Sequence, residues 1–379
     1  MSEWKECKLG DVIFFGNGKA RPKNEGIIPI YGGNGILGYC NQYNYQDETI
    51  IIGRVGAYCG SVFYENKSIW VSDNALSAKP KERNNTKFLF YFLKNLELNQ
   101  FAEGSSHPLV TQTLLNSIDI EIPEKVNEQS AIASVLSSLD DKIDLLNRQN
   151  KTLEAMAETL FRQWFVEEAE DGWEEKELNE ILEFVVDNRG RTAPTSDTGI
   201  PLIATNCIKN ENIYPLYEKV RYVDQETYND WFRAHPKPGD IIFVNKGTPG
   251  CVNFVPDPVD FCIAQDMVAL RVCLNSMSRY YLFLFLRSNE IQSQILNSSV
   301  GTTIPHLKKT DLLKFIIEVP PKKILDNFDS KVSTYFSKMN INMKQIRTLS
   351  TLRDTLLPKL MSGEVRVSEH DYRIKGFQD

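Results

Sequence analysis

The chain has 379 residues, and its 43 Lys and Arg against 50 Asp and Glu give a formal net charge of −7. This length exceeds one ordinary core and predicts two or three domains, while a hydrophobic share of 42% excludes wholesale disorder. The acidic balance excludes a protein that coats nucleic acid through bulk positive charge. The seven cysteines form no Cys-x-x-Cys pair, and no apolar run reaches the roughly 18 residues of a membrane span. We therefore expect a soluble, cytoplasmic protein with free thiols.

The chain contains an internal repeat. Residues 104–123 align without a gap with residues 301–320, both beginning at Gly and ending at Pro. Two upstream segments also have counterparts, since 88–93 aligns with 281–286 and 49–52 aligns with 240–243. The same order of segments in both copies predicts two versions of one domain.

Each copy begins with short β-like runs separated by Gly, Pro and Asn, such as 27–31, 49–52 and 61–64. An apolar helix is expected next, at about 87–98 in the first copy and 279–296 in the second. A Gly-x-x-x-Pro turn and a last strand then close the copy. The sequence predicts an α+β fold in which both domains are mostly β.

A long helix with a heptad pattern is expected after each copy, over about 128–166 and 323–357, with Pro358 and Gly363 ending the second helix. Apolar residues follow steps of four and three, and each seam contains one Asn, a residue that fixes register in coiled coils. The predicted seam residues are Leu139, Ile143, Leu146, Asn150, Leu153, Val332, Tyr335, Met339, Asn342, Ile346 and Leu349.

The charges of the two helices are opposite. Residues 128–170 carry a net charge of −5, and residues 322–360 carry +5. Opposite charges favour pairing of unlike helices. We therefore predict two similar domains joined by an antiparallel coiled coil with pseudo-two-fold symmetry; the alternative is that each helix packs only on its own domain.

Candidate catalytic motifs are weak. Gly33-Asn-Gly35-Ile-Leu-Gly38 fits the dinucleotide-binding pattern, but no helical period follows it. Asp240 lies on a strand like that of metal-dependent nucleases, but Asn245 stands where a second carboxylate is needed. The four His form no catalytic or metal-binding spacing. We predict no catalytic residue and no metal site.

Three segments resemble one known family. Tyr-Gly-Gly-Asn-Gly-Ile-Leu-Gly-Tyr at 31–39, Leu-Glu-Ala-Met-Ala-Glu-Thr-Leu-Phe-Arg-Gln-Trp-Phe at 153–165, and Leu-Pro-Lys-Leu-Met-Ser-Gly-Glu-Val-Arg at 357–366 are similar to recurrent segments of the specificity (S) subunit of type I restriction–modification enzymes, the HsdS family. With the order of domains and helices, the resemblance covers nearly the whole chain.

The resemblance implies two target-recognition domains, each reading half of a split DNA sequence, on a coiled-coil spacer that docks two methyltransferase (M) subunits. It implies no catalysis and no cofactor in this chain, because S-adenosylmethionine, ATP and Mg belong to the M subunits and to the restriction motor-nuclease (R) subunits. The expected divisions are recognition domains at 1–127 and 170–322, spacer helices at 128–169 and 323–366, and a tail at 367–379. Trp164 and Phe165, at one end of a spacer helix, are candidates for partner docking, or else pack on their own domain.

DNA contact is expected from local loops, because residues 1–127 carry a net charge of −1 and residues 171–321 carry −5. Arg and Lys bind phosphate or guanine, and Asn reads adenine. The candidate DNA-binding residues are Lys19, Arg21, Lys23, Asn34, Arg54, His107, Arg189, Arg191, Asn206, Lys246, His306 and Lys308.

The leading hypothesis is a sequence-specific DNA-recognition subunit. The main alternative is a coiled-coil scaffold between proteins without DNA recognition, which the acidic balance favours. A third hypothesis, a stand-alone nuclease using Asp240, predicts Mg²⁺-dependent cutting by the pure chain, which we do not expect.

Overall fold

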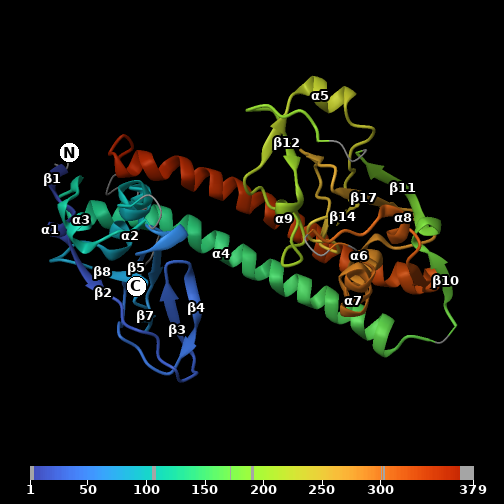
Figure 1. Ribbon diagram of the computed structural model, residues 1–379, viewed down its shortest axis with the longest axis horizontal. Helices are drawn as coiled ribbons and strands as arrows, with labels where there is room; N and C mark the ends of the chain where they lie inside the picture. The colour runs from blue at the N-terminus through green and yellow to red at the C-terminus, as the bar shows by residue number, and fades with distance from the viewer. Residues whose placement is uncertain are drawn as a thin grey trace. The chain divides into compact units, whose positions relative to one another are not determined.

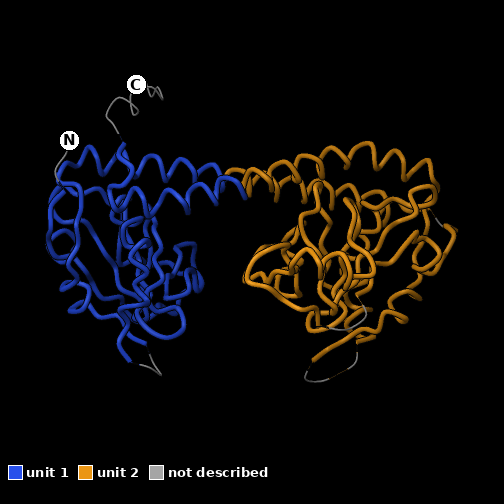
Figure 2. Tube along the Cα trace, turned by 90° about the horizontal axis from the view of Figure 1, so that it is seen from above, with its two compact units in different colours: residues 1–144, 347–379 blue, residues 145–346 orange. Residues whose placement is uncertain are grey.

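The computed structural model describes residues 4–104, 108–170, 172–188, 192–299, 301 and 304–367. The chain divides into two compact units (Figure 2), with residues 1–144 and 347–379 in unit 1 and residues 145–346 in unit 2. Each unit contains one β-rich domain and part of both long helices, α4 (Val126–Arg162) and α9 (Lys322–Met361) (Figure 1).

The β-rich domain of unit 1 contains three sheets. Its four-stranded sheet has the order β2-β8-β5-β6, and its three-stranded sheet has the order β4-β3-β7. Strand β1 pairs with β9 and so joins the two ends of the domain. The strands are β1 (Trp4–Lys8), β2 (Ile13–Asn17), β3 (Ile28–Gly32), β4 (Gly35–Cys40), β5 (Thr49–Gly53), β6 (Val62–Glu65), β7 (Trp70–Val71), β8 (Ala75–Pro80) and β9 (Asp119–Pro123). The short helices are α1 (Leu9–Val12), η1 (Gly56–Tyr58), α2 (Thr86–Asn95), η2 (Leu98–Phe101) and α3 (Gln112–Ser117).

Unit 2 repeats this set of sheets. A four-stranded sheet has the order β11-β17-β14-β15, a three-stranded sheet has the order β13-β12-β16, and β10 pairs with β18. The strands are β10 (Glu174–Glu177), β11 (Leu182–Asp187), β12 (Ile200–Ile203), β13 (Arg221–Val223), β14 (Ile241–Val244), β15 (Val252–Phe254), β16 (Cys262–Ile263), β17 (Met267–Val272) and β18 (Ile316–Val319). The short helices are η4 (Leu178–Ile181), η5 (Thr205–Cys207), α5 (Gln225–Asp230), α6 (Arg279–Arg287), α7 (Asn289–Ser298) and α8 (Lys309–Leu312). The predicted α+β fold with two similar, mostly-β domains is confirmed.

The single apolar helix expected at 279–296 is wrong, because the segment forms two helices, α6 and α7. Ser288 between them has an extended backbone, with φ −63° and ψ 148°. Its hydroxyl accepts a hydrogen bond from the Ile291 amide and so caps α7. Both helices bury apolar side chains in the unit 2 core, among them Leu282 and Ile295.

The two long helices run antiparallel. Within unit 2, the Asn342 amide donates to the Asn150 side chain at 2.8 Å, and the rings of Trp164 and Phe328 lie 6.0 Å apart. Residues later in α4 therefore contact residues earlier in α9, as in an antiparallel coiled coil. All the residues predicted for the seam are buried or half-buried.

Two details of the long helices differ from expectation. Helix α4 gives way to a π-helical turn at Gln163–Glu167, and α9 continues through Pro358 to Met361 instead of ending there. Leu360 and Met361 are 1% and 4% exposed in the unit 1 core, so their burial outweighs the backbone hydrogen bond that Pro358 cannot make.

Candidate nucleic-acid interface

The loops of unit 1 gather at one end of its β-domain, and backbone hydrogen bonds join them. Near the hairpin between β3 and β4, the Ser72 amide donates to the Tyr31 carbonyl at 2.8 Å. The loop after β5 is fixed on both sides, because the Arg54 amide donates to the Asn74 carbonyl at 3.0 Å and the Val110 amide donates to the Arg54 carbonyl at 2.9 Å. We call these segments loop cluster 1, comprising residues 17–20, 33–37, 53–58, 71–75 and 108–110.

Unit 2 has the same arrangement of backbone hydrogen bonds between its own loops, and we call this shared arrangement the frame. The Ala264 amide donates to the Ile203 carbonyl at 2.9 Å, and the Asn245 amide donates to the Asp266 carbonyl at 2.9 Å. The Leu307 amide donates to the Asn245 carbonyl at 2.8 Å. We call these segments loop cluster 2, comprising residues 188, 192, 203–208, 244–250, 264–266 and 305–308. Both domains therefore share the same backbone scaffold.

One further backbone hydrogen bond in each unit joins the loop after the central strand, β5 or β14, to the proline of the repeat. The Gly56 amide donates to the Pro108 carbonyl at 3.1 Å, and the Gly247 amide donates to the Pro305 carbonyl at 3.0 Å. Both glycines have positive φ, +78° and +91°, a region that favours glycine. In both units the last residue of the Gly-x-x-x-Pro repeat therefore accepts a hydrogen bond from the loop that follows the central strand, β5 or β14.

The candidate DNA-binding residues of unit 1 lie in or beside loop cluster 1. Lys19 is exposed, and its backbone bridges to Ser72. Asn34 is exposed at the tip of the β3–β4 hairpin, and Arg21 and Lys23 are exposed in the segment before β3. His107 lies outside the described residues.

Arg54 is half-buried in loop cluster 1, and its Nε atom is buried without a hydrogen-bond partner among the described residues. Nε is covered by the protein itself, so an acceptor from DNA could reach only the exposed part of this side chain. The repeated frame places Asn245, not Lys246, at the equivalent position in unit 2. The Asn245 side chain donates to the Leu307 carbonyl at 3.1 Å and so forms a hydrogen bond within unit 2.

The candidates of unit 2 fall into two groups. Lys246 and Lys308 are exposed, and Lys246 bridges to half-buried His306 through the backbone. The Asn206 side chain is exposed, and its amide donates to the Glu218 carbonyl at 2.7 Å. Arg189 and Arg191 lie outside the described residues.

Sequence reasoning did not identify Asn74 and Asp266 as parts of the frame. Their carbonyls accept hydrogen bonds from the Arg54 and Asn245 amides. An alignment of 72–74 with 264–266, one step after the short strands β7 and β16, contains the signal that would have identified them.

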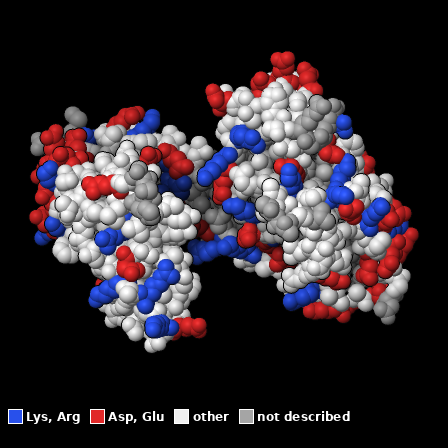
Figure 3. All heavy atoms as spheres, in the orientation of Figure 1, with Lys and Arg blue, Asp and Glu red and all other residues white. Residues whose placement is uncertain are grey.

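Charge is distributed unevenly over the face shown in Figure 3. Acidic side chains gather over α5 and around β10, whereas Lys and Arg side chains gather over β3 and β4. A local basic surface of this kind is compatible with a chain whose net charge is negative.

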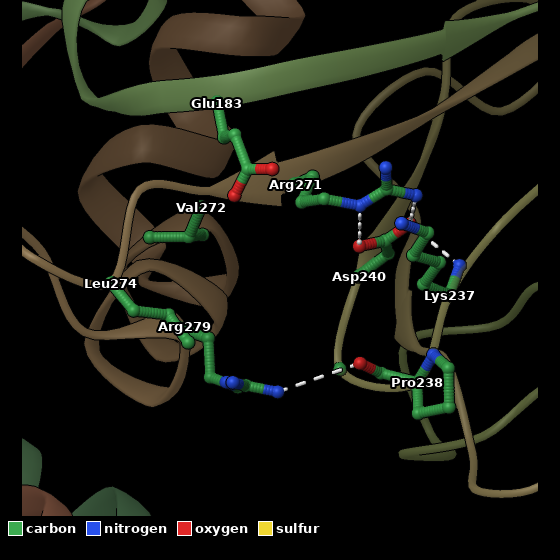
Figure 4. A pocket seen from close by; sticks show the side chains of 9 residues that line it. Glu183, Lys237, Pro238, Asp240, Arg271, Val272, Leu274 and Arg279 are labelled. Atoms are coloured by element: carbon green, nitrogen blue, oxygen red, sulfur yellow. Dashed lines mark hydrogen bonds and ion pairs between the residues drawn. The ribbon is translucent and has the colours of Figure 1, made fainter.

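Asp240 lines a small cavity of about 120 Å³ together with Arg271, Arg279, Lys237 and Glu183 (Figure 4). The Asp240 carboxylate is already engaged, because Arg271 donates to it from Nε at 3.0 Å and from Nη2 at 2.8 Å, and the Lys237 amide donates at 2.8 Å. The described part of the chain has no group of three or more His, Cys, Asp or Glu side chains that could hold a metal ion. Asp240 therefore stabilises the sheet of unit 2 through a buried ion pair.

A buried ion pair attaches the β-domain of unit 2 to α4. Arg287 of α6 donates from Nη2 to Glu154 of α4 at 2.6 Å, and the two side chains are only 10% and 15% exposed. Burial raises the pKa of Glu154, and the positive charge of Arg287 opposes that rise. In unit 1 the corresponding attachment uses Asp140, which accepts from Tyr91 and from Arg353, both at 2.7 Å.

The two aromatic residues proposed for partner docking pack inside unit 2. Phe165 is 6% exposed, and its ring lies 4.8 Å from that of Tyr281 and 4.9 Å from that of Phe328. Trp164 is half-buried against the same Phe328 ring. Docking by Phe165 is therefore wrong, because burial against its own domain already uses its apolar surface.

None of the helices in the described part of the chain is long and apolar enough to cross a membrane.

Comparisons with known proteins agree with this architecture. The family model described as type I restriction modification DNA specificity domain matches residues 1–155 and 170–349. The chain is 30% identical over 320 residues to the type I restriction enzyme MjaIX specificity subunit of Methanocaldococcus jannaschii, covering 76% of this chain and 71% of that protein. It is 24% identical to a putative specificity subunit of Haemophilus influenzae, S.HindORF215P, with 90% and 91% of the two chains covered.

A solved structure shares the fold. The S subunit of a type I restriction–modification system from M. genitalium superposes with a TM-score of 0.63 at 18% identity, covering 95% of this chain and 96% of that one. The family match spans both repeats and most of α4 and α9. The chain therefore belongs to the family of type I restriction–modification specificity subunits, which recognise DNA and are not catalytic.

Proposed function

We propose that loop cluster 1 and loop cluster 2 each read one half of a bipartite DNA target. The observation that supports this proposal is the repeated hydrogen-bond frame, which holds Arg54 and Asn245 at equivalent positions in the two domains. Two equivalent modules in one chain suit a target with two halves, as two-fold dimers suit palindromic operators.

The candidate residues divide the work of binding in this proposal. Lys19, Arg21 and Lys23 of unit 1, and Arg189, Arg191, Lys246 and Lys308 of unit 2, supply charge for phosphate contacts, which position the protein without reading sequence. Arg54, a half-buried Arg whose backbone is fixed in loop cluster 1, is the strongest candidate for guanine. Asn34 and Asn206 are candidates for adenine, and His107 and His306 are further candidates for DNA contact.

The long helices complete the proposal as a spacer and a docking surface. Residues 128–169 and 323–366 would set the distance between recognition domains at 1–127 and 170–322, and the pairing of Asn150 with Asn342 would fix the register of the helices. Two M subunits would dock on this chain and supply S-adenosylmethionine-dependent methylation. R subunits would supply ATP- and Mg-dependent translocation and cutting, in the cytoplasm.

The test uses the chain assembled with its M subunits and duplexes of random sequence. Selection of a motif with two specific halves and a fixed gap supports the proposal, and enrichment of no motif supports a scaffold without DNA recognition. Charge reversal at Lys19, Arg21, Arg189 and Arg191 should lower affinity for all sequences and reduce its salt dependence. The matched control is Lys5→Glu, an exposed residue on β1 outside the loop clusters, which should change neither.

Arg54→Ala separates base reading from phosphate binding. It should relax selection at one position of the unit 1 half-site at a cost of about 1–3 kcal/mol, and leave the other half-site unchanged. Equal weakening on every sequence would contradict a base-reading role for Arg54.

A further inference from the structure

Loop cluster 1 exposes apolar side chains among its polar residues. Val55 and Tyr58 of the loop after β5 are 40% and 54% exposed, and Ile36 beside the hairpin tip is 48% exposed. Each exposed apolar side chain is unexceptional singly, but these three lie on segments that the frame joins.

The exposed side chains are held by rigid backbone. The Ser61 hydroxyl lies within hydrogen-bond distance of the Gly33 carbonyl at the hairpin tip and of the Tyr58 carbonyl, the latter at 2.8 Å. The Val55 backbone bridges to Leu109, and η1 is closed by a hydrogen bond of 3.0 Å from the Cys59 amide to the Gly56 carbonyl. A fixed backbone presents these side chains without a large entropic cost on binding.

Loop cluster 2 has different side chains at the corresponding positions. Ile36 lies on β4 opposite Tyr31, whereas in unit 2 the strand paired antiparallel with β12 is β13, where exposed Arg221 lies opposite Leu202. Lys246 follows Asn245 where Val55 follows Arg54, and the counterpart of Tyr58, counted from Arg54 and Asn245, is half-buried Pro249. The frame is therefore shared, while the exposed side chain that follows Arg54 is apolar and the one that follows Asn245 is charged.

The charges around loop cluster 1 favour DNA as the occupant of this apolar surface. Lys19 and Arg54 stand on the same frame as Val55, and Arg21 and Lys23 lie nearby in the chain. Cations around an apolar surface suit a polyanion whose interior carries apolar groups. In the major groove of DNA, the C5-methyl group of thymine is such a group, and it pairs with apolar side chains.

We propose that Ile36, Val55 and Tyr58 read thymine methyl groups in the half-site of unit 1, and that Lys246, the counterpart of Val55, makes no such contact in unit 2. This inference rests on the proposed function, since it requires that loop cluster 1 faces the major groove. It assigns a specificity role to side chains that carry no charge and make no side-chain hydrogen bond within the described structure.

The test replaces thymine by deoxyuridine, one position at a time, in the duplex selected by the complex with M subunits. At least one replacement in the unit 1 half-site should weaken binding about fourfold, the value of one buried methylene-sized group. Val55→Thr keeps the shape of the side chain and should weaken binding to the thymine duplex by a similar factor. If Val55 is the contact, deoxyuridine should then cause no further loss in that variant; Ile36→Thr and Tyr58→Asn test the other two side chains in the same way.

The outcomes are distinct for the two proposals. Selection of no bipartite motif would contradict DNA reading as a whole. Selection of a motif in which deoxyuridine is neutral at every thymine of the unit 1 half-site would overturn only the methyl contact. Thr248→Val is the matched control in unit 2, and it should leave the response to deoxyuridine in the unit 1 half-site unchanged.

Discussion

The buried ion pair between Arg287 and Glu154 allows a quantitative test of how unit 2 is held to its long helix. Both side chains are removed from water, at 10% and 15% exposure, and Nη2 lies 2.6 Å from Oε1. Arg287 also donates to the Asn210 carbonyl and lies over the Phe283 ring, with 5.1 Å from Cζ to the ring centroid. Replacement by Met retains much of the apolar stem and removes the charge.

Arg287→Met leaves the Glu154 carboxylate buried without its counter-charge. Removing one partner of a buried pair costs about 3–5 kcal/mol, so the free energy of unfolding of unit 2 should fall by that amount near pH 7.5. Burial already raises the pKa of Glu154 with Arg287 present, and the loss of Arg287 raises that pKa further. The folded state then binds the proton more tightly than the unfolded state does.

The pH dependence follows from that sign. Because the folded pKa of Glu154 lies above the unfolded value of about 4.3, stability falls as pH rises from that value through the folded pKa. The deficit of Arg287→Met should therefore be largest at neutral pH and shrink on acidification towards pH 5. Each further unit of pKa shift corresponds to about 1.4 kcal/mol.

Urea denaturation followed by tryptophan fluorescence measures these changes, and Glu154→Gln supplies the second arm of a double-mutant cycle. The double variant Arg287→Met with Glu154→Gln should regain most of the loss, because no buried charge remains. Lys322→Met serves as the control, since its ion pair with Asp326 is 46% and 60% exposed and should contribute at most about 1 kcal/mol. A deficit below about 1 kcal/mol in Arg287→Met, or one independent of pH, would refute the reasoning.

Three shorter predictions concern other buried or constrained groups. Burial lowers the pKa of His235, so unit 2 should lose stability as pH falls through about 6.5, and His235→Phe should flatten that loss in urea denaturation at pH 5.5–8. Asn342→Leu removes a fully buried amide whose Oδ1 has no partner in the described structure, so it should raise the free energy of unfolding by about 1 kcal/mol. The same change should loosen the register of the two helices, so that cysteines introduced at Leu146 and Ile346 form a smaller share of the disulfide-linked product. Gly56 has φ +78° with open space around it, so Gly56→Ala should cost about 1–2 kcal/mol and Gly56→Asn less, measured by thermal unfolding.

The architecture follows from the sequence where its signals are local. Heptad spacing is a property of neighbouring turns, so the two long helices are predictable to within a few residues at most ends. The exceptions need tertiary information. Helix α9 passes through Pro358 because Leu360 and Met361 are buried in unit 1, and α6 ends at Ser288 because that residue caps α7.

The candidate site is less predictable than the fold for the same reason. Residue type and repeat position identify Arg54, Asn206 and Lys246 as candidates, but type does not say which polar groups are already engaged. The Asn206 amide donates to the Glu218 carbonyl, and the Arg54 Nε is buried without a partner in the described structure. Both facts depend on which residues the fold brings next to these side chains, and residue type alone does not indicate that.

The repeated frame explains how one fold can carry two different recognition surfaces. The chain from Tyr31 to Arg54 is shorter than the chain from Ile203 to Asn245, and the longer segment contains β13 and α5. Despite this difference, the same carbonyls and amides meet in both units. Because the frame consists of backbone hydrogen bonds, the exposed side chains on it contribute little to folding. Substitutions at Ile36, Val55, Tyr58 or Lys246 should therefore change what the domain binds before they change whether it folds.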